Sequence, residues 1–383
     1  MSDPSTEHRR FRVLVVGGGV AGIETLLALR DLAGDRVALT LLAPNDEFVY
    51  RPMSVREPFA FAAAARYPLA TIAADLGVEL VADKLGWVEP EQQVVHTESA
   101  VPLEYDALVL TLGATLYPRF KHAITIDDRR MDESMRGLIQ DVEAGYLTSV
   151  AFVAPGRMAW PLPLYELALM TAGRAEDMGA ELDATLITPE DRPLSLFGEE
   201  VSDGVAALLA AKRIRVITSS YTEIPKAGEL VINPGDRRLR VQRAVALPEL
   251  YGPAVRGLPV SEHGFLRVDR FGQVPDTGPV FAAGDAVDFA VKQGGVGSQQ
   301  ADVAAESVAA LAGADIAPKP FNPEIYGVLL TDEKPRYIHA KITGGHGFSS
   351  EFREEPIAGM TQKIAARYLA PYLDGLESRR VLA

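Results

Sequence analysis

The chain has 383 residues, 23% of them charged and 48% hydrophobic, which is typical of a globular protein with two or three domains. The formal net charge of -14 predicts repulsion from nucleic-acid phosphates, so we expect no nucleic-acid partner. The complete absence of cysteine excludes disulfides, thiolate metal sites, redox-active cysteine pairs and cysteine nucleophiles.

Two further functional classes are disfavoured. The six histidines are scattered without HxH or HxxxH spacing, so we expect no metal site. The first ten residues lack the apolar segment of a secretory signal, and no window approaches about 18 consecutive apolar residues. We therefore expect a cytoplasmic protein.

The first segment with a clear pattern is "FRVLVVGGGVAGIETLLALRDLAGDRVALTLLAP". Residues 11–16 form a short apolar run that predicts a buried strand. Residues 20–32 have the apolar spacing of a helix, and residues 37–42 predict a second strand. The order of strand, glycine turn, helix and strand indicates a βαβ unit and hence a parallel sheet.

Within this unit, Gly17, Gly19 and Gly22 form a G-x-G-x-x-G motif between strand and helix. The first glycine permits a tight turn, the second lets the backbone approach a diphosphate, and the third allows close helix packing. The free amides of the helix N-terminus attract phosphate. The predicted contacts with a dinucleotide are Gly17, Gly18, Gly19, Val20, Ala21 and Gly22.

One expected feature of this motif is missing. The second strand ends in Ala43, where Asp or Glu usually binds a ribose hydroxyl. Asn45, Asp46 or Glu47 substitutes from the following loop, or these are only solvated loop residues. Of the three, we select Asn45 as a predicted contact.

The middle of the chain predicts a weaker copy of the same unit. A strand in "YDALVLTLGATLYP" ends at Gly113, and residues 132–145 predict a solvent-facing helix. Residues 150–153 predict a strand, residues 164–172 a helix and residues 184–190 the next strand. Further on, residues 201–211 predict a helix and "IRVIT" a strand.

The last third contains a strand and turn in "GPVFAAGDAVDF" and an alanine-rich helix over residues 297–313. The stretch "EIYGVLLTDEKPRYIHAKITG" alternates as antiparallel strands do. Residues 361–376 predict a final amphipathic helix interrupted at Pro371. Core packing or a homodimer contact is the preferred interpretation of this helix, and attachment to a membrane surface is the alternative.

Together, the glycine motif, "LVLTLGAT" and "GPVFAAGDAV" resemble the flavoproteins with two dinucleotide-binding domains. That group includes type II NADH dehydrogenases, sulfide:quinone oxidoreductases and disulfide reductases. The resemblance implies noncovalent FAD. It implies contacts with the cofactor from Gly113, Ala114, Gly284, Asp285, Lys292, Gln293, Gly294 and Gly295, with Asp285 binding the ribityl chain or diphosphate. It also implies that Arg51 and Pro52 lie beside the flavin ring. A surface position is the alternative for Lys292, and an apolar packing loop for Arg51 and Pro52.

The second turn, "VAPGRMAWPLPLYE", is less typical of a nucleotide site. It keeps one glycine, Gly156, and Pro161 and Pro163 lack N–H donors. Trp160 lines a pocket or packs in the core, and Glu190 is the one candidate for a ribose contact. Sulfide:quinone oxidoreductases, which this turn resembles, do not use pyridine nucleotide. NAD(P)H binding at Gly156, Trp160 and Glu190 therefore stays open.

The predicted fold is α/β, with two Rossmann-like domains containing parallel sheets and a small C-terminal α+β region. The predicted boundaries are 1–118 and 255–325 for the FAD domain, 119–254 for the second domain and 326–383 for the C-terminal region. The predicted function is transfer of electrons from a donor, NAD(P)H by default, through FAD to an acceptor such as a quinone. The alternatives are a flavoprotein with another donor and a non-catalytic redox sensor. Without cysteine, no disulfide reduction is available.

Overall fold

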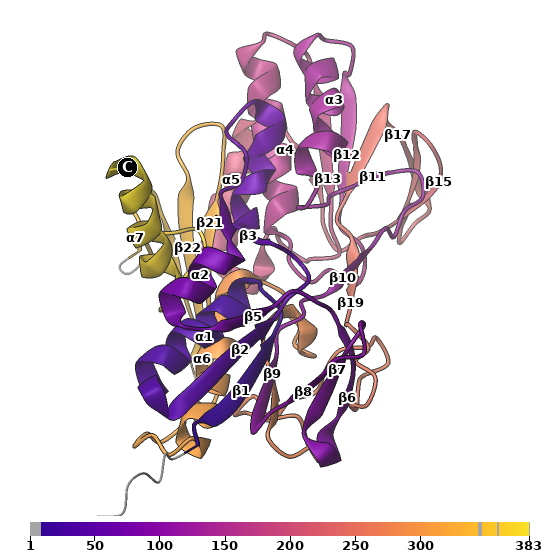
Figure 1. Ribbon diagram of the computed structural model, residues 1–383. Coiled ribbons are helices and arrows are strands. Elements are labelled where there is room, and N and C mark those ends of the chain that lie inside the picture. Colours follow the sequence, from indigo (N-terminus) through magenta and orange to yellow (C-terminus); the bar gives the residue numbers. More distant parts are fainter. Residues whose placement is uncertain (1–8, 344–346, 358–359, 383) are drawn as a thin grey trace, which may run out of the picture.

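The computed structural model describes residues 9–343, 347–357 and 360–382, which form two lobes (Figure 1). The lower lobe contains a five-stranded parallel sheet. Its strands, in spatial order, are β20 (Val280–Ala282), β9 (Ala107–Leu110), β1 (Phe11–Val16), β2 (Val37–Leu42) and β5 (Glu79–Val81). Because β20 follows β9 only after a long excursion of the chain, the upper lobe is inserted between two strands of one sheet.

Strand β1 shows why this sheet is buried on both faces. Val13 and Val15 point to a core shared with α1 (Val20–Ala33) and α6 (Gly294–Leu311). Leu14 and Val16 point to the opposite core. That core is closed by an antiparallel sheet of β6 (Leu85–Glu89), β7 (Val94–Thr97) and β8 (Pro102–Glu104). The alternation of a strand places successive apolar side chains in different cores.

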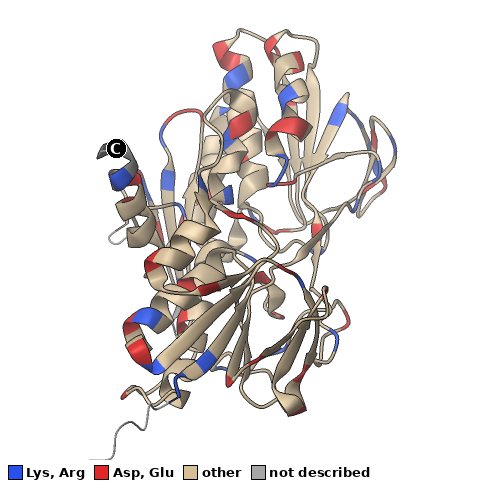
Figure 2. Ribbon diagram, in the orientation of Figure 1, with Lys and Arg blue, Asp and Glu red and all other residues tan. Residues whose placement is uncertain are grey.

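The upper lobe contains a second five-stranded parallel sheet. Its strands, in spatial order, are β11 (Ile124–Thr125), β18 (Arg243–Ala246), β12 (Ser149–Val153), β13 (Asp183–Ile187) and β14 (Arg215–Ile217). Its helices are α3 (Met131–Glu143), α4 (Leu162–Asp177) and α5 (Glu199–Ala211). An antiparallel meander of β15 (Tyr221–Lys226), β16 (Glu229–Asn233) and β17 (Arg237–Arg240) lies beside the sheet. Acidic and basic residues are interspersed along α3 and α4 (Figure 2).

Helix α3 corrects one expectation. It was predicted to face solvent, but Met131, Met135 and Val142 are buried in the core of the upper lobe. Its polar residues, which dominate the sequence, occupy the outer face. Helix α4 begins at Leu162, two residues before the predicted start.

The two lobes are joined by a short antiparallel pair, β10 (Thr115–Tyr117) and β19 (Glu249–Tyr251). The chain enters the upper lobe through the first strand and leaves it through the second. In the lower lobe, β3 (Glu47–Val49) pairs with β4 (Arg66–Pro68), which leads into α2 (Leu69–Leu76).

The C-terminal region contains the predicted antiparallel strands. They are β21 (Glu324–Leu329) and β22 (Arg336–Thr343), and a third strand that was not predicted, β23 (Gly347–Arg353), pairs with β22. The last helix, α7 (Leu369–Leu382), corrects the sequence-based expectation, since it begins eight residues later than predicted. Pro371 does not interrupt it, because a proline in the first turn removes no helical hydrogen bond.

The tail before and within α7 packs against the lower lobe (Figure 1). Ile364, Leu369 and Leu373 are buried there. The buried carboxylate of Glu24 in α1 accepts hydrogen bonds from the amides of Tyr368 and Leu369, at 2.9 and 2.6 Å. The apolar residues that suggested an amphipathic surface helix therefore contact the core of the lower lobe, and most of them are half-buried. In the described part of the chain, no helix has the length and apolar character needed to cross a membrane.

Candidate dinucleotide-binding site

The first glycine motif lies at the carboxyl end of β1. At this point the strand order reverses, because β2 lies on one side of β1 and β9 on the other. Gly17 has φ +117°, and a Cβ there would lie 2.4 Å from the carbonyl oxygen of Thr111. A Cβ on Gly22 would lie 1.8 Å from the carbonyl oxygen of Gly17. By contrast, a Cβ on Gly19 would meet nothing within 4 Å. Two of the glycines are therefore required by packing, and the third borders open space.

Gly19 is also the N-cap of α1, and no side chain caps this helix end. Val20 and Ala21 form its first turn, so their amides point toward the same open side. Gly18 lies against Leu69, whose Cδ1 would be 2.6 Å from a Cβ at this position. A helix N-terminus of this kind offers donors and positive potential to a diphosphate.

The end of β2 and the loop after it contain the residues considered for a ribose contact. Ala43 is buried, and Asn45 is exposed in the loop that follows. Glu47 is paired with Arg66 at 3.2 Å. Of the three loop residues considered for a ribose contact, Asn45 and Asp46 therefore keep exposed side chains that no hydrogen bond or ion pair among the described residues engages.

The second part of the site is the turn after β20. Gly284 has φ +77°, and a Cβ there would approach the Cβ of Ala21 to 3.0 Å. The following residue, Asp285, is thereby placed beside the start of α1. Among the described residues, no hydrogen bond reaches its carboxylate, and burial raises its pKa to about 6. A half-buried carboxylate without donors is suited to accept hydrogen bonds from a ligand.

Lys292 is buried, so the surface alternative for this residue is wrong. Its Nζ donates to the carbonyl oxygens of Asp285, at 3.1 Å, and Val287, and it lies 3.9 Å from the centre of the Phe265 ring. Burial lowers its pKa to about 8. These contacts indicate that Lys292 closes the turn that presents Asp285.

Arg51 lies in the loop after β3, and the nearest carboxylate belongs to Asp128, at 3.8 Å. No hydrogen bond to the Arg51 guanidinium is present among the described residues, and burial lowers its pKa. The charge on Asp128 raises the pKa of Asp285, so Arg51, Asp128 and Asp285 share one region. Asp128 follows β11 in "TIDDRR" and has no motif, so the sequence did not identify it.

The start of α6 contributes the remaining predicted contacts. Gln293 caps this helix: its Oε1 accepts from the amide of Val296 at 2.7 Å, and its Nε2 donates to the carbonyl of Tyr326 at 2.7 Å. Its side chain is therefore committed within the protein. Gly294 and Gly295 follow as the first residues of α6. Gly113 has φ +74° just beyond β9, followed by Ala114, and a Cβ at Gly113 would meet nothing within 4 Å.

The second turn differs from the first in its neighbours, although Gly156 is itself exposed. A Cβ on Gly156 would lie 3.2 Å from the ring of Tyr221. At the start of α4, Pro161 and Pro163 supply no N–H, and the amide of Leu164 donates to the carbonyl of Pro161 at 3.0 Å. Leu162, the remaining donor of this turn, is buried.

The other two predicted nucleotide contacts of the upper lobe are committed to protein. Glu190 Oε2 accepts hydrogen bonds from the hydroxyls of Tyr165, at 2.6 Å, and Thr188, at 2.9 Å. Trp160 is half-buried and packs edge-on against Phe197 with ring centres 5.8 Å apart, as the core interpretation predicts. Gly156 is exposed, whereas Trp160 and Glu190 are half-buried and contact other protein side chains.

Comparison with known proteins agrees with this geometry. Residues 166–307 match the family model described as pyridine nucleotide-disulphide oxidoreductase. A sulfide-quinone reductase of Aquifex aeolicus (strain VF5) is 27% identical over 210 residues, which are 53% of this chain and 47% of the relative. Over these segments the chain is similar to the pyridine nucleotide-disulphide oxidoreductases.

Solved structures of oxidoreductases share the fold. The sulfide:quinone oxidoreductase from Aquifex aeolicus superposes with a TM-score of 0.82 at 20% identity, covering 97% of this chain and 90% of that chain. A ferredoxin reductase from Rhodopseudomonas palustris superposes with a TM-score of 0.68 at 17% identity, covering 89% and 88%. The sequence match to the curated relative spans about half the length of that relative. The predicted α/β fold with two parallel sheets is confirmed.

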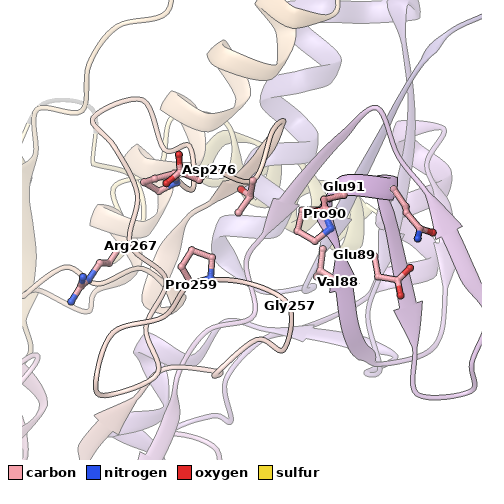
Figure 3. Close-up of a pocket in the computed structure, with 11 residues that line it drawn as sticks. Val88, Glu89, Pro90, Glu91, Gly257, Pro259, Arg267 and Asp276 are labelled. Atoms are coloured by element: carbon pink, nitrogen blue, oxygen red, sulfur yellow. The ribbon is translucent and has the colours of Figure 1, made fainter.

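A cavity of about 800 Å³ lies away from this site (Figure 3). It separates the segment from Val88 to Gln92 from a loop that carries Gly257 and Pro259. None of the predicted cofactor contacts lines it. Within the described residues, no group of three or more His, Asp or Glu side chains is arranged to hold a metal ion.

Proposed function

We propose that the protein is an oxidoreductase that binds FAD noncovalently and passes electrons from a reduced small molecule or protein to an acceptor such as a quinone. The observation that carries this proposal is the open side of Gly19 at the uncapped start of α1, next to the unpartnered carboxylate of Asp285. These groups match the diphosphate and the sugar-alcohol chain of FAD.

Each residue of the site has a distinct task in this proposal. The amides at the start of α1 neutralise the diphosphate, and Asp285 accepts hydrogen bonds from hydroxyl groups. Lys292 keeps the Asp285 turn closed. The start of α6 directs its dipole toward the ring end of the cofactor, where it stabilises negative charge. Arg51, whose guanidinium lies 3.8 Å from Asp128, offers a cation on the same side. When bound, FAD supplies the electron-transfer chemistry itself.

The geometry favours a donor other than NAD(P)H, which was the default expectation. The ring of Tyr221 lies beside Gly156, two prolines leave few amides at the start of α4, and Glu190 accepts a hydrogen bond from Tyr165. In addition, the amide of Lys292 donates to the carbonyl of Ala159 at 3.2 Å, which ties the second turn to the segment before α6. The absence of cysteine leaves no route for electrons through protein sulfur.

An anaerobic titration tests both parts of the proposal. The purified protein is expected to be yellow, or to become yellow with added FAD, and dithionite is expected to bleach it. NADH and NADPH are expected to leave the flavin oxidised over minutes. A soluble quinone is then expected to reoxidise the reduced protein faster than oxygen does. Protein that stays colourless with excess FAD contradicts the function, and rapid bleaching by NADH contradicts the proposed donor class.

A further inference from the structure

A buried ion pair joins the C-terminal segment to three other parts of the chain next to the proposed cofactor site. The Nζ of Lys363 lies 2.6 Å from Glu166 Oε1, and the two side chains are 9% and 1% exposed. The same Nζ donates to the carbonyl oxygen of Pro52 at 3.0 Å. Glu166 Oε1 also accepts from the amide of Leu330 at 2.9 Å. The pair therefore connects the loop after β3, helix α4 and the end of β21.

The residues after Lys363 reach the second element proposed to face the flavin ring. The amide of Ile364 donates to the hydroxyl of Tyr50 at 2.8 Å, one residue before Arg51. A Cβ on Gly294 would lie 2.8 Å from Ile364 Cδ1, and one on Gly295 would lie 3.3 Å from the carbonyl oxygen of Ala365. The segment 363–365 thus contacts both the Pro52 loop and the first turn of α6.

The energetics argue for a role beyond stability. Burial lowers the pKa of Lys363 and raises that of Glu166, while their mutual attraction acts in the opposite direction on both. A buried ion pair adds little net stability, because the desolvation of two charges offsets their attraction. It does impose a specific geometry, since an ammonium without its partners is very costly in the interior. The carbonyl of Pro52 is held by that geometry.

We propose that Lys363 is a positioning residue for the ring end of the cofactor. Its ammonium, neutralised by Glu166, holds the carbonyl of Pro52 and so fixes the Arg51–Pro52 loop relative to the first turn of α6. This inference rests on the proposed function, because the ring is assigned to this place only if FAD binds in the first glycine turn. The C-terminal segment then contacts both elements that border the ring, the Arg51–Pro52 loop and the first turn of α6.

The test replaces Lys363 by methionine, which keeps the length of the side chain but removes the donor. Lys212→Met is the matched control. Lys212 Nζ lies 2.5 Å from Asp332 and 2.9 Å from Glu176, so it also ties α4 to the segment after β21. Glu176 is ten residues beyond Glu166, about 15 Å along α4, so this second tie is remote from Pro52.

Three properties of the FAD-loaded proteins are measured: the visible absorption spectrum of the flavin, its reduction potential and the rate of FAD dissociation. Lys363→Met is expected to alter the spectrum and the potential and to speed FAD dissociation about tenfold or more. Lys212→Met is expected to match the wild type in all three. If the two variants behave alike, the inference is overturned while the proposed function stands. If the wild type takes up no FAD, the proposed function itself fails.

A second variant separates positioning from folding. Lys363→Met alone leaves Glu166 buried without its cation, which destabilises the fold. The double variant Lys363→Met, Glu166→Gln removes both charges and keeps an acceptor for the amide of Leu330. It is expected to recover thermal stability relative to the single variant while the flavin spectrum stays altered. A double variant that folds and shows the wild-type spectrum and potential refutes the role of Lys363.

Discussion

The carbonyl oxygen of Gly17 occupies the place where a side chain on Gly22 would begin, at 1.8 Å from a Cβ. Strand β1 and helix α1 are packed through this contact, so the third glycine of the motif is required by the fold. Gly19, three residues earlier, has no atom within 4 Å of a Cβ. Gly22 is therefore required for packing, whereas Gly19 leaves space that a ligand can occupy.

We expect Gly22→Ala to destabilise the protein by about 1–3 kcal/mol or to prevent folding, because backbone must move to admit the methyl group. Gly19→Ala is expected to fold with a thermal unfolding midpoint close to that of the wild type, since its φ of -90° suits alanine. Its affinity for FAD is expected to fall about tenfold or more, because the methyl group enters the space of the diphosphate. Thermal unfolding and FAD titration check the pair. Full FAD affinity in Gly19→Ala would show that this side of the turn is not a ligand surface.

The protonation of Asp285 predicts a pH dependence of FAD binding. Burial raises its pKa to about 6 in the chain without cofactor. Since hydroxyl donors favour the ionised carboxylate, protonation competes with FAD, and affinity is expected to fall as pH drops through about 6. At pH 5 the loss relative to pH 7 is about tenfold. Asp285→Asn should bind FAD more weakly at pH 7 and lose this dependence. A wild-type affinity that is constant from pH 7 to 5 contradicts the role of Asp285.

The raised pKa of Asp302 in α6 predicts a pH dependence of stability. Burial and the nearby Glu24 raise the pKa of Asp302 to about 8, so its protonated form hydrogen-bonds Glu24. A carboxyl group whose folded pKa is raised holds a proton that the unfolded chain loses near pH 4, so stability declines as pH rises from about 4 toward 8. Asp302→Asn cannot ionise and is expected to gain about 1–3 kcal/mol at pH 7. At pH 4 the gain is expected to disappear. Equal stability of the two proteins at both pH values would contradict the raised pKa.

Glu24 itself holds the C-terminal helix. Its carboxylate accepts hydrogen bonds from the amides of Tyr368 and Leu369. Amides at the start of a helix have no acceptor within the helix itself. Glu24→Ala is expected to cost about 2–4 kcal/mol and to increase amide hydrogen exchange in α7 before the rest of the chain. Exposed Glu79→Ala, in strand β5, is a control that should leave α7 protected. Uniform exchange rates across the chain in Glu24→Ala would show that α7 is not a separately released unit.

Sequence reasoning was most effective where a requirement is local. Gly17, Gly19 and Gly22 specify the backbone of one turn, and Gly284 with Asp285 specifies another, so neighbouring residues alone reveal them. Boundaries were less accurate where propensity and packing disagree. The polar sequence of α3 suggested a solvent-facing helix, although every third or fourth residue is buried. The start of α7 was misplaced because its N-terminus is capped by Glu24, more than 300 residues away in the chain.

By itself, the sequence excluded chemistry through cysteine and predicted the first glycine turn and two parallel sheets. Composition and short local patterns encode these properties directly. Only the tertiary structure showed that Tyr221 lies beside Gly156, that Tyr165 binds Glu190, and that Asp128 and Lys363 contact the Arg51–Pro52 loop. Those contacts join residues far apart in the chain. Their existence depends on how the lobes pack, which no local pattern records.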